Sequence, residues 1–196
     1  MSPRGVPVPD VRQRLFDAAE RVLGAAGPDG LTSRAVTTEA GCAKGLLYNH
    51  FADLDEFVAE LVLDRLRGTA ERAEALPGLA GRGTVAGNLT EAACSLLDAH
   101  APAVAGLAMT RAGVSARIRA AMAAGAPGFG TVEVAVVGYL DAEKRLGRVR
   151  ADLDADSVAL AVVGTAHHLL MTSWAGSPDP RDALRRLVVA LVGGPG

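Results

Sequence analysis

The sequence predicts an all-α protein in two parts. An amino-terminal helix-turn-helix head would cover residues 1–52, and a larger helical domain would cover residues 53–196. Three observations support this prediction. Apolar residues recur at helical spacing along most of the chain, strand-like alternation does not persist anywhere, and glycine and proline separate the periodic segments. The apolar content of 49% is ample for a core.

The first predicted helix covers residues 10–26. Leu15, Val22 and Leu23 fall on one face at helical spacing. The pair Gly27-Pro28 then ends the helix, because glycine and proline both interrupt helical backbone. An amphipathic helix of this length can support the shorter helices that follow it.

Residues 31–51 are predicted to form two short helices joined by a tight turn, the arrangement of a DNA-binding helix-turn-helix. Thr32 can cap the first helix, since its hydroxyl can accept a free backbone N–H. Gly41 ends that helix, because glycine tolerates the left-handed backbone that the turn requires. Residues 44–50 would form the second helix, with Leu47 facing inward. Its outer face would carry groups that suit phosphates and base edges: Lys44, Tyr48, Asn49 and His50.

Several of these residues occur in an order that resembles the TetR family of transcriptional regulators. The matching pieces are Arg14-Leu15-Phe16-Asp17-Ala18-Ala19, Gly30-Leu31-Thr32-Ser33-Arg34, Ala40-Gly41, Lys44-Gly45 and Leu47-Tyr48-Asn49-His50-Phe51. They lie within residues 11–60, roughly a quarter of the chain. Farther along, the family-like features are the helix layout and the segment Gly147-Arg148-Val149-Arg150-Ala151-Asp152-Leu153-Asp154.

The resemblance implies a surface that contacts DNA. Lys44 and Gly45 match positions that approach base edges or nearby phosphates. Tyr48 and His50 match phosphate contacts, and Asn49 lies between them. Positions at the start of the preceding helix match contacts that clamp the DNA backbone: Thr32, Ser33 and Arg34.

The remaining helices follow from turn signals and caps. Asp53 and Glu56 resemble a capping box at the start of a long helix that would run to about residue 75 and connect the head to the larger domain. The Gly/Pro-rich loop at 77–83 is the predicted hinge. Further helices are predicted over residues 84–100, 102–112, 115–124, 128–146, 154–175 and 179–193.

Two carboxy-terminal helices predict a homodimer. Residues 158–166 carry no charged side chain, and a helix that is apolar on all sides must be buried on more than one side. Residues 184–192 offer a second apolar stripe. The resemblance implies that two such helices from each subunit pair into a four-helix interface. A monomeric core is the alternative explanation of the same pattern.

A pocket for a small apolar effector is expected in the larger domain. Large, soft or aromatic side chains on Ala-rich helices could line such a cavity. For each of them, ordinary core packing is the alternative. The candidates are Cys94, Leu97, Met109, Phe129, Tyr139, His168, Met171 and Trp174.

Sequence motifs of an enzyme or a metal site are missing. The chain has no nucleophile elbow, phosphate loop or metalloprotease pattern, so we expect no catalytic residue and no cofactor. His167 and His168 are adjacent, so they would point about 100° apart on a helix, which disfavours a shared metal ion. A membrane-spanning run, a signal peptide and a spaced cysteine motif are also missing, which predicts a cytoplasmic protein.

The charge of the chain is compatible with two different functions. The net charge is −2, and residues 1–51 carry six Arg/Lys against five Asp/Glu, so DNA binding would depend on a few well-placed groups. In addition, Ala43 stands where the resembling family usually has Ser or Thr. The favoured function is a repressor that a small molecule releases from double-stranded, near-palindromic operator DNA. The alternative is a protein-interaction module on the same fold that lacks specific DNA binding.

Overall fold

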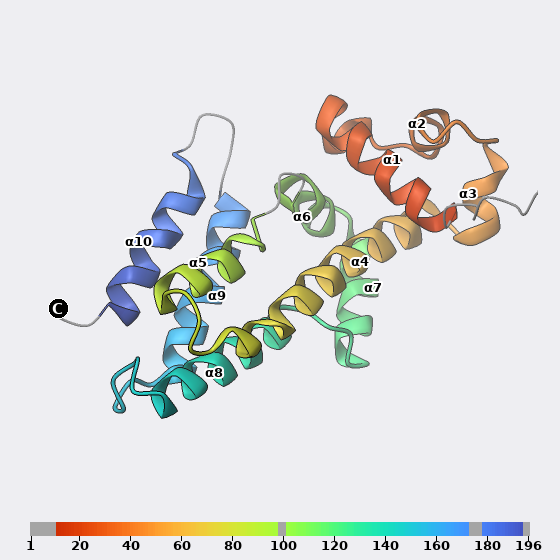
Figure 1. Ribbon diagram of the computed structural model, residues 1–196. Helices are drawn as coiled ribbons and strands as arrows, with labels where there is room; N and C mark the ends of the chain where they lie inside the picture. The colour runs from red at the N-terminus through yellow and green to blue at the C-terminus, as the bar shows by residue number, and fades with distance from the viewer. Residues whose placement is uncertain (1–10, 98–100, 173–177, 194–196) are drawn as a thin grey trace, which may run out of the picture.

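The part of the chain that the structure describes folds into helices and their connections. The computed structural model describes residues 11–97, 101–172 and 178–193, and within these ranges it contains ten α-helices and no strand. The all-α prediction is therefore confirmed. Helices α1–α3 form a head at one end of the long helix α4, while α5, α8, α9 and α10 gather around the other end of α4 (Figure 1).

Most helix bounds follow the predicted segments, but the helix predicted over residues 84–100 ends already at Cys94. In the head, α1 covers Val11–Ala26, α2 covers Ser33–Glu39 and α3 covers Gly45–His50. The larger part contains α4 (Leu54–Glu74), α5 (Val85–Cys94), α6 (Ala101–Thr110), α7 (Ala112–Ala123), α8 (Phe129–Arg145), α9 (Ala155–Thr172) and α10 (Pro180–Val192). Short 3-10 turns cover Pro28–Gly30 and Leu76–Leu79.

The head is built on an aromatic cluster that includes a residue of α4. Phe16 of α1, Phe51 after α3 and Phe57 of α4 have ring centroids 5.0–5.9 Å apart, a spacing typical of stabilising aromatic pairs. Val104 and Leu107 of α6 belong to the same buried core. This core, called the head-side core below, therefore crosses the domain boundary predicted at residue 52.

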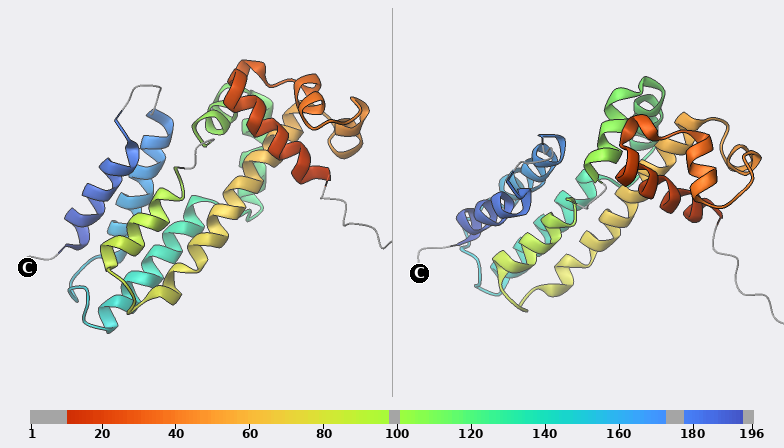
Figure 2. Two further views of the ribbon diagram at one scale, coloured as in Figure 1. Left: turned by 45° about the horizontal axis from the view of Figure 1, so that its top comes forward. Right: turned by 90° about the horizontal axis from the view of Figure 1, so that it is seen from above.

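A second core, called the body core below, lies between α5, α8, α9 and α10. Its fully buried side chains include Leu89, Leu140, Val162 and Leu184. Helices α4 and α8 run side by side in both further views (Figure 2), and α8 also packs on α9. The apolar stretch of α9 is thus buried mainly within its own chain, whereas Leu160 is 64% exposed.

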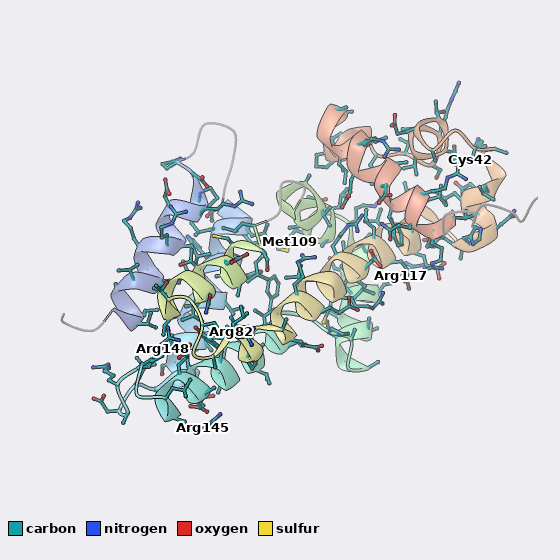
Figure 3. All side chains as sticks on the ribbon, viewed as in Figure 1. Cys42, Arg82, Met109, Arg117, Arg145 and Arg148 are labelled. Atoms are coloured by element: carbon teal, nitrogen blue, oxygen red, sulfur yellow. The ribbon has the colours of Figure 1, made fainter. Side chains whose placement is uncertain are left out.

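The loop predicted as a hinge is held in place. Its backbone N–H at Gly81 donates to Glu143 Oε1 over 3.2 Å, and the carbonyl at Gly83 accepts from Arg148 Nη2 over 2.5 Å. Glu143 is fully buried and lies 3.5 Å from Arg148 Nη1. Arg148 and Arg82 mark this end of the molecule, far from the head (Figure 3). The loop therefore works as an anchor between α4 and α8 rather than as a hinge.

No helix of the described ranges is both long enough and apolar enough to cross a membrane.

Loss of the Arg148 guanidinium should destabilise the fold. In Arg148→Met the Glu143 carboxylate stays buried without its ionic partner, and such a loss is costly. Because Arg148 is partly solvated, we expect a loss of about 1–3 kcal/mol in the free energy of unfolding. Urea denaturation followed by circular dichroism measures it. Arg145→Met is the matched control: Arg145 is exposed at the end of α8, three residues before Arg148, so its change should stay within about 0.5 kcal/mol. Equal stability of the two variants would contradict the anchor.

Candidate functional site

The helix-turn-helix forms by the local devices that the sequence predicts. Thr32 precedes α2 in extended backbone, and its Oγ1 accepts from the Ala35 N–H over 3.1 Å. Gly41 has φ 63°, a conformation that L side chains adopt with strain. The turn is closed by the Cys42 N–H, which donates to the Thr37 carbonyl over 3.0 Å. These contacts confirm the predicted cap and turn, and they set the direction in which α3 leaves.

Helix α3 buries one side and exposes the other. Leu47 is fully buried and Phe51, just after the helix, is 2% exposed. The opposite side carries the exposed residues Lys44, Gly45, Tyr48, Asn49 and His50. The structure therefore brings these predicted contact residues onto one surface of the head.

The start of α2 lies beside this surface. The Ser33 and Tyr48 hydroxyls are 2.9 Å apart and share a hydrogen bond. Thr32 and Arg34 are exposed next to Ser33. The two groups of predicted contact residues, at the start of α2 and on α3, thus form one continuous face.

Charge on this face comes from few groups. Other head cations are engaged elsewhere: Arg21 Nε is 2.6 Å from Glu39 Oε1, and Arg14 donates to the Ala40 carbonyl over 3.2 Å. Within the described residues, Arg34 and Lys44 have no ion-pair partner. The face therefore offers two uncompensated cations, several hydroxyl and amide groups, and the ring of His50, a set that suits phosphates and base edges.

The start of α3 lacks the side-chain cap that is usual for a helix. Lys44 occupies the capping position in helical backbone, and no side chain caps the helix there. Ala43, which precedes it, has no hydroxyl to offer. The Leu46 N–H donates to the Ala43 carbonyl over 2.9 Å, and no side chain caps the other N–H groups of this turn, which can therefore bind water or a phosphate.

A cavity of ≈ 770 Å³ lies between the two cores, within the usual range of small-molecule sites, about 300–1,000 Å³. Val62, Leu66 and Ile118 line it from the head-side core. Leu96, Phe129 and Leu170 line it from the body core. Met109 of α6 marks its position in Figure 3. A molecule that fills this space would contact both cores at once.

The residues predicted to line a pocket divide into two groups. Met109, Phe129 and Met171 line the cavity. The lining does not include Cys94, Leu97, Tyr139 or His168, and Trp174 lies outside the described residues.

Those four side chains have other surroundings. Tyr139 is fully buried in the body core, where its hydroxyl accepts from Asn88 Nδ2 over 2.9 Å and burial raises its pKa to about 12. Leu97 is buried in that core and Cys94 packs against it, which raises the pKa of the Cys94 thiol. His168 is exposed on α9, whereas its neighbour His167 lines the cavity with its ring centroid 5.0 Å from that of Phe129. Large and soft side chains therefore occur in the core as well as in the cavity wall, so these residue types did not distinguish the two in the sequence.

Sequence reasoning missed the charged part of the cavity wall. Arg65 of α4 lies there, with Nε 2.5 Å from Glu20 Oε1 and Nη2 3.4 Å from Asp17 Oδ1, both on α1. Partial burial opposes the charge of Arg65, but its hydrogen bond to Glu20 and the nearby carboxylates outweigh that effect and raise its pKa. Arg67 and Arg72 also line the cavity. The link between head and α4 is therefore part of the cavity wall.

In the part of the chain that the structure describes, no three His, Cys, Asp or Glu side chains lie together as metal ligands would.

Comparison with known proteins confirms the family resemblance. Residues 15–61 match the sequence model for bacterial regulatory proteins of the tetR family. That segment contains the whole helix-turn-helix and the first part of α4. The comparison with curated proteins found no match to the chain.

Solved structures share the fold over nearly the full chain. A TetR-family transcriptional regulator from Mesorhizobium loti has a TM-score of 0.71 at 19% identity, with 96% of each chain covered. Bacillus subtilis FadR in complex with stearoyl-CoA has a TM-score of 0.65 at 18% identity, covering 94% of this chain and 99% of FadR. The multidrug binding protein EbrR, complexed with imidazole, has a TM-score of 0.56 at 24% identity, covering 96% and 98%. The chain thus has the TetR fold, with a helix-turn-helix head and a larger helical domain.

Removal of the Thr32 hydroxyl should weaken the head. Thr32→Ala leaves the Ala35 N–H without its capping acceptor, so we expect a loss of about 1 kcal/mol in unfolding free energy. Chemical denaturation measures it. Thr38→Ala, at an exposed position of the same helix, is the control and should change stability by less than about 0.5 kcal/mol. A larger effect of the control would show that Thr32 is not the cap that matters.

Proposed function

We propose, from the premise that this chain is a TetR-family protein, that it is a homodimeric repressor whose operator binding a small molecule weakens. The single observation that carries the DNA-binding half is the continuous face formed by the start of α2 and the outer side of α3. On this proposal, Lys44 and Gly45 approach base edges or nearby phosphates. Tyr48 and His50 bind phosphates with Asn49 between them.

The start of α2 would clamp the backbone of the DNA on the other side of the turn. This role would fall to Thr32, Ser33 and Arg34. The hydrogen bond between the Ser33 and Tyr48 hydroxyls supports it, because it puts the start of α2 beside the outer side of α3. Phosphate binding would replace that mutual hydrogen bond by two bonds to a charged acceptor, which are stronger. The uncompensated cations Arg34 and Lys44 favour DNA over a protein partner, the alternative function for this fold.

The cavity supports the ligand-responsive half of the proposal. It is large enough for a drug-sized molecule and is walled by apolar side chains from both cores. Two structures that share the fold hold small molecules, stearoyl-CoA in FadR and imidazole in EbrR. We infer that an effector in this cavity shifts the position of the head relative to the body and so lowers operator affinity.

A homodimer would supply the second head. Two heads that serve successive major grooves on one side of DNA must lie about 34–36 Å apart. Helices α9 and α10 offer exposed apolar side chains for the interface, Leu160 at 64% and Val189 at 51% exposure. Because large apolar side chains prefer burial, a second copy of these helices would stabilise the pair.

Substitutions on the α3 face should weaken DNA binding in two distinguishable ways. Tyr48→Phe removes one hydrogen bond to a phosphate and should lower affinity by about 1 kcal/mol or more on every DNA sequence. Lys44→Ala should also reduce the salt dependence of binding by about one unit of slope. The measurement is fluorescence anisotropy on an operator selected from a random DNA pool, repeated at several salt concentrations.

The control for these variants is Arg145→Ala, which removes an exposed cation at the end of α8, far from the head (Figure 3). Its affinity and salt slope should match those of the unmodified protein. If both α3 variants bind the selected operator unchanged at fixed salt, the assignment of this face is wrong. If the pool yields no bound sequence at all, the protein-interaction alternative is favoured.

Charge placed on α9 should break the dimer. Leu160→Glu puts a carboxylate into the proposed apolar interface, where an unpaired charge is costly. Sedimentation velocity at micromolar concentration should then show a folded monomer. Val134→Glu on α8 is the control, because Val134 is 73% exposed but lies outside α9 and α10, and it should remain dimeric. Val162 is unsuitable for this test, since it is fully buried in its own chain. A monomeric unmodified protein would contradict the dimer.

A further inference from the structure

Helix α4 presents two arginines on the side that faces the cavity. Arg65, Gly68 and Arg72 are spaced so that they share one face of the helix, and all three line the cavity. Glycine weakens the interior of a helix, but at position 68 the missing side chain leaves space on the surface of α4. A side chain at Gly68 would begin 3.6 Å from Arg72 Nη1. The Arg72 guanidinium therefore lies beside the bare backbone of Gly68, which is about one helical turn from Arg65.

Arg72 has N–H donors that remain available to a ligand. Its Nη2 donates to the Thr69 hydroxyl over 3.1 Å. No carboxylate of the described residues lies within ion-pair distance of it. A guanidinium carries five N–H donors, so Arg72 can still bind a planar anion such as a carboxylate or a phosphate edge.

Arg65 is engaged, and its partners belong to the head. Glu20 and Asp17 of α1 hold it from one side, and Asp64 lies 3.3 Å from its Nη1. Arg67 also lies 3.5 Å from Asp64. Three of the four carboxylates in the cavity wall are thus compensated by arginines, which leaves Glu71 as the lining carboxylate without an ion pair in the described residues.

We propose that the effector is an amphipathic anion whose apolar body fills the cavity and whose carboxylate or phosphate binds Arg72 and Arg65. This inference rests on the proposed function of the cavity and names the ligand class and the path of the signal. The anion competes with Glu20 and Asp17 for the Arg65 guanidinium. Binding therefore loosens the link between α1 and α4, and the head is released from its position.

Direct binding tests the ligand class. Three probes share one chain length and differ in charge: dodecanoate, dodecyltrimethylammonium and neutral dodecanol, each titrated into the full-length protein by calorimetry below its micelle concentration. We expect dodecanoate to bind at least about tenfold more tightly than either of the others, since a hydrogen-bonded charge pair contributes about that factor.

Arginine variants locate the site. Arg72→Met should weaken dodecanoate by about tenfold without loss of stability, because Arg72 is exposed and makes no ion pair. Arg119→Met removes an exposed arginine outside the cavity and should leave affinity unchanged. Unchanged dodecanoate affinity in Arg72→Met, or equal binding of the cationic probe, would overturn the proposal.

Hydrogen exchange of the α1 amides tests the path of the signal. Dodecanoate should accelerate exchange in α1 of the unmodified protein severalfold. Glu20→Gln should show faster exchange without ligand and little further change with it. Glu60→Gln is the matched control, because it removes the other ion pair between α1 and α4, Arg12–Glu60 at 3.1 Å, which lies outside the cavity wall.

In that control, the response of α1 to dodecanoate should persist. A response lost equally in Glu20→Gln and Glu60→Gln would overturn the role of Arg65, because any α1–α4 link would then suffice. Operator selection from the random DNA pool is independent of these probes. Successful selection together with failed dodecanoate binding would therefore refute this inference and leave the proposed DNA-binding function standing.

Discussion

The rest of the structure depends on the continuity of α4, which is shared by both cores. Its first turns bury Phe57, Val58 and Leu61 among the head helices, and its last turns bury Ala73 in the body core. At 21 residues the helix is about 32 Å long, and no proline interrupts it. A continuous hydrogen-bonded helix of this kind can transmit a displacement at one end to the other, so a change in the body core can reach the head.

Because the cavity lies beside α4, a ligand bound in it can affect both cores. It lies where the two cores meet, and one wall of it is α4 itself. Close-packed cores resist gradual deformation and change between discrete arrangements. A ligand that displaces Val62 and Leu170, which line the cavity from the two cores, would therefore alter both cores together. The anchor formed by Glu143, Arg148 and Gly81 holds the far end of α4, which directs any movement toward the head.

Local patterns predicted the head well because its determinants are local. The Thr32 cap, the left-handed Gly41 and the buried Leu47 each act within a few residues, so periodicity and turn chemistry sufficed. The contact between Ser33 and Tyr48 spans two helices but follows from the same turn. The helices of the larger domain were likewise predictable from their periodicity and their glycine and proline boundaries.

The cavity could not be predicted in the same way, because its lining depends on how distant helices pack. Tyr139 and Cys94 have the size and softness of lining residues, yet α8 and α5 turn them into or against the body core. The charged wall looked like an ordinary solvated helix face, since Arg65 and Arg72 alternate with acidic residues along α4. One local signal was available, the glycine at position 68 between two arginines in an otherwise regular helix. Its meaning depends on knowing that this face is turned toward a cavity.

The weak charge of the head and the ion pairs in the cavity wall both affect how an effector could release DNA. Most head cations are held by intramolecular partners, which leaves few to attract DNA non-specifically. On the proposed function, operator affinity would then depend on the correct spacing of two heads more than on charge. A coupling of about 1–3 kcal/mol is typical of allosteric proteins, and the exchange of Glu20 for an effector anion on Arg65 is a change of that order for a partly solvated pair. On the proposed function, a small change in one α1–α4 contact in each subunit of a homodimer would therefore be sufficient to release an operator that is recognised through geometry.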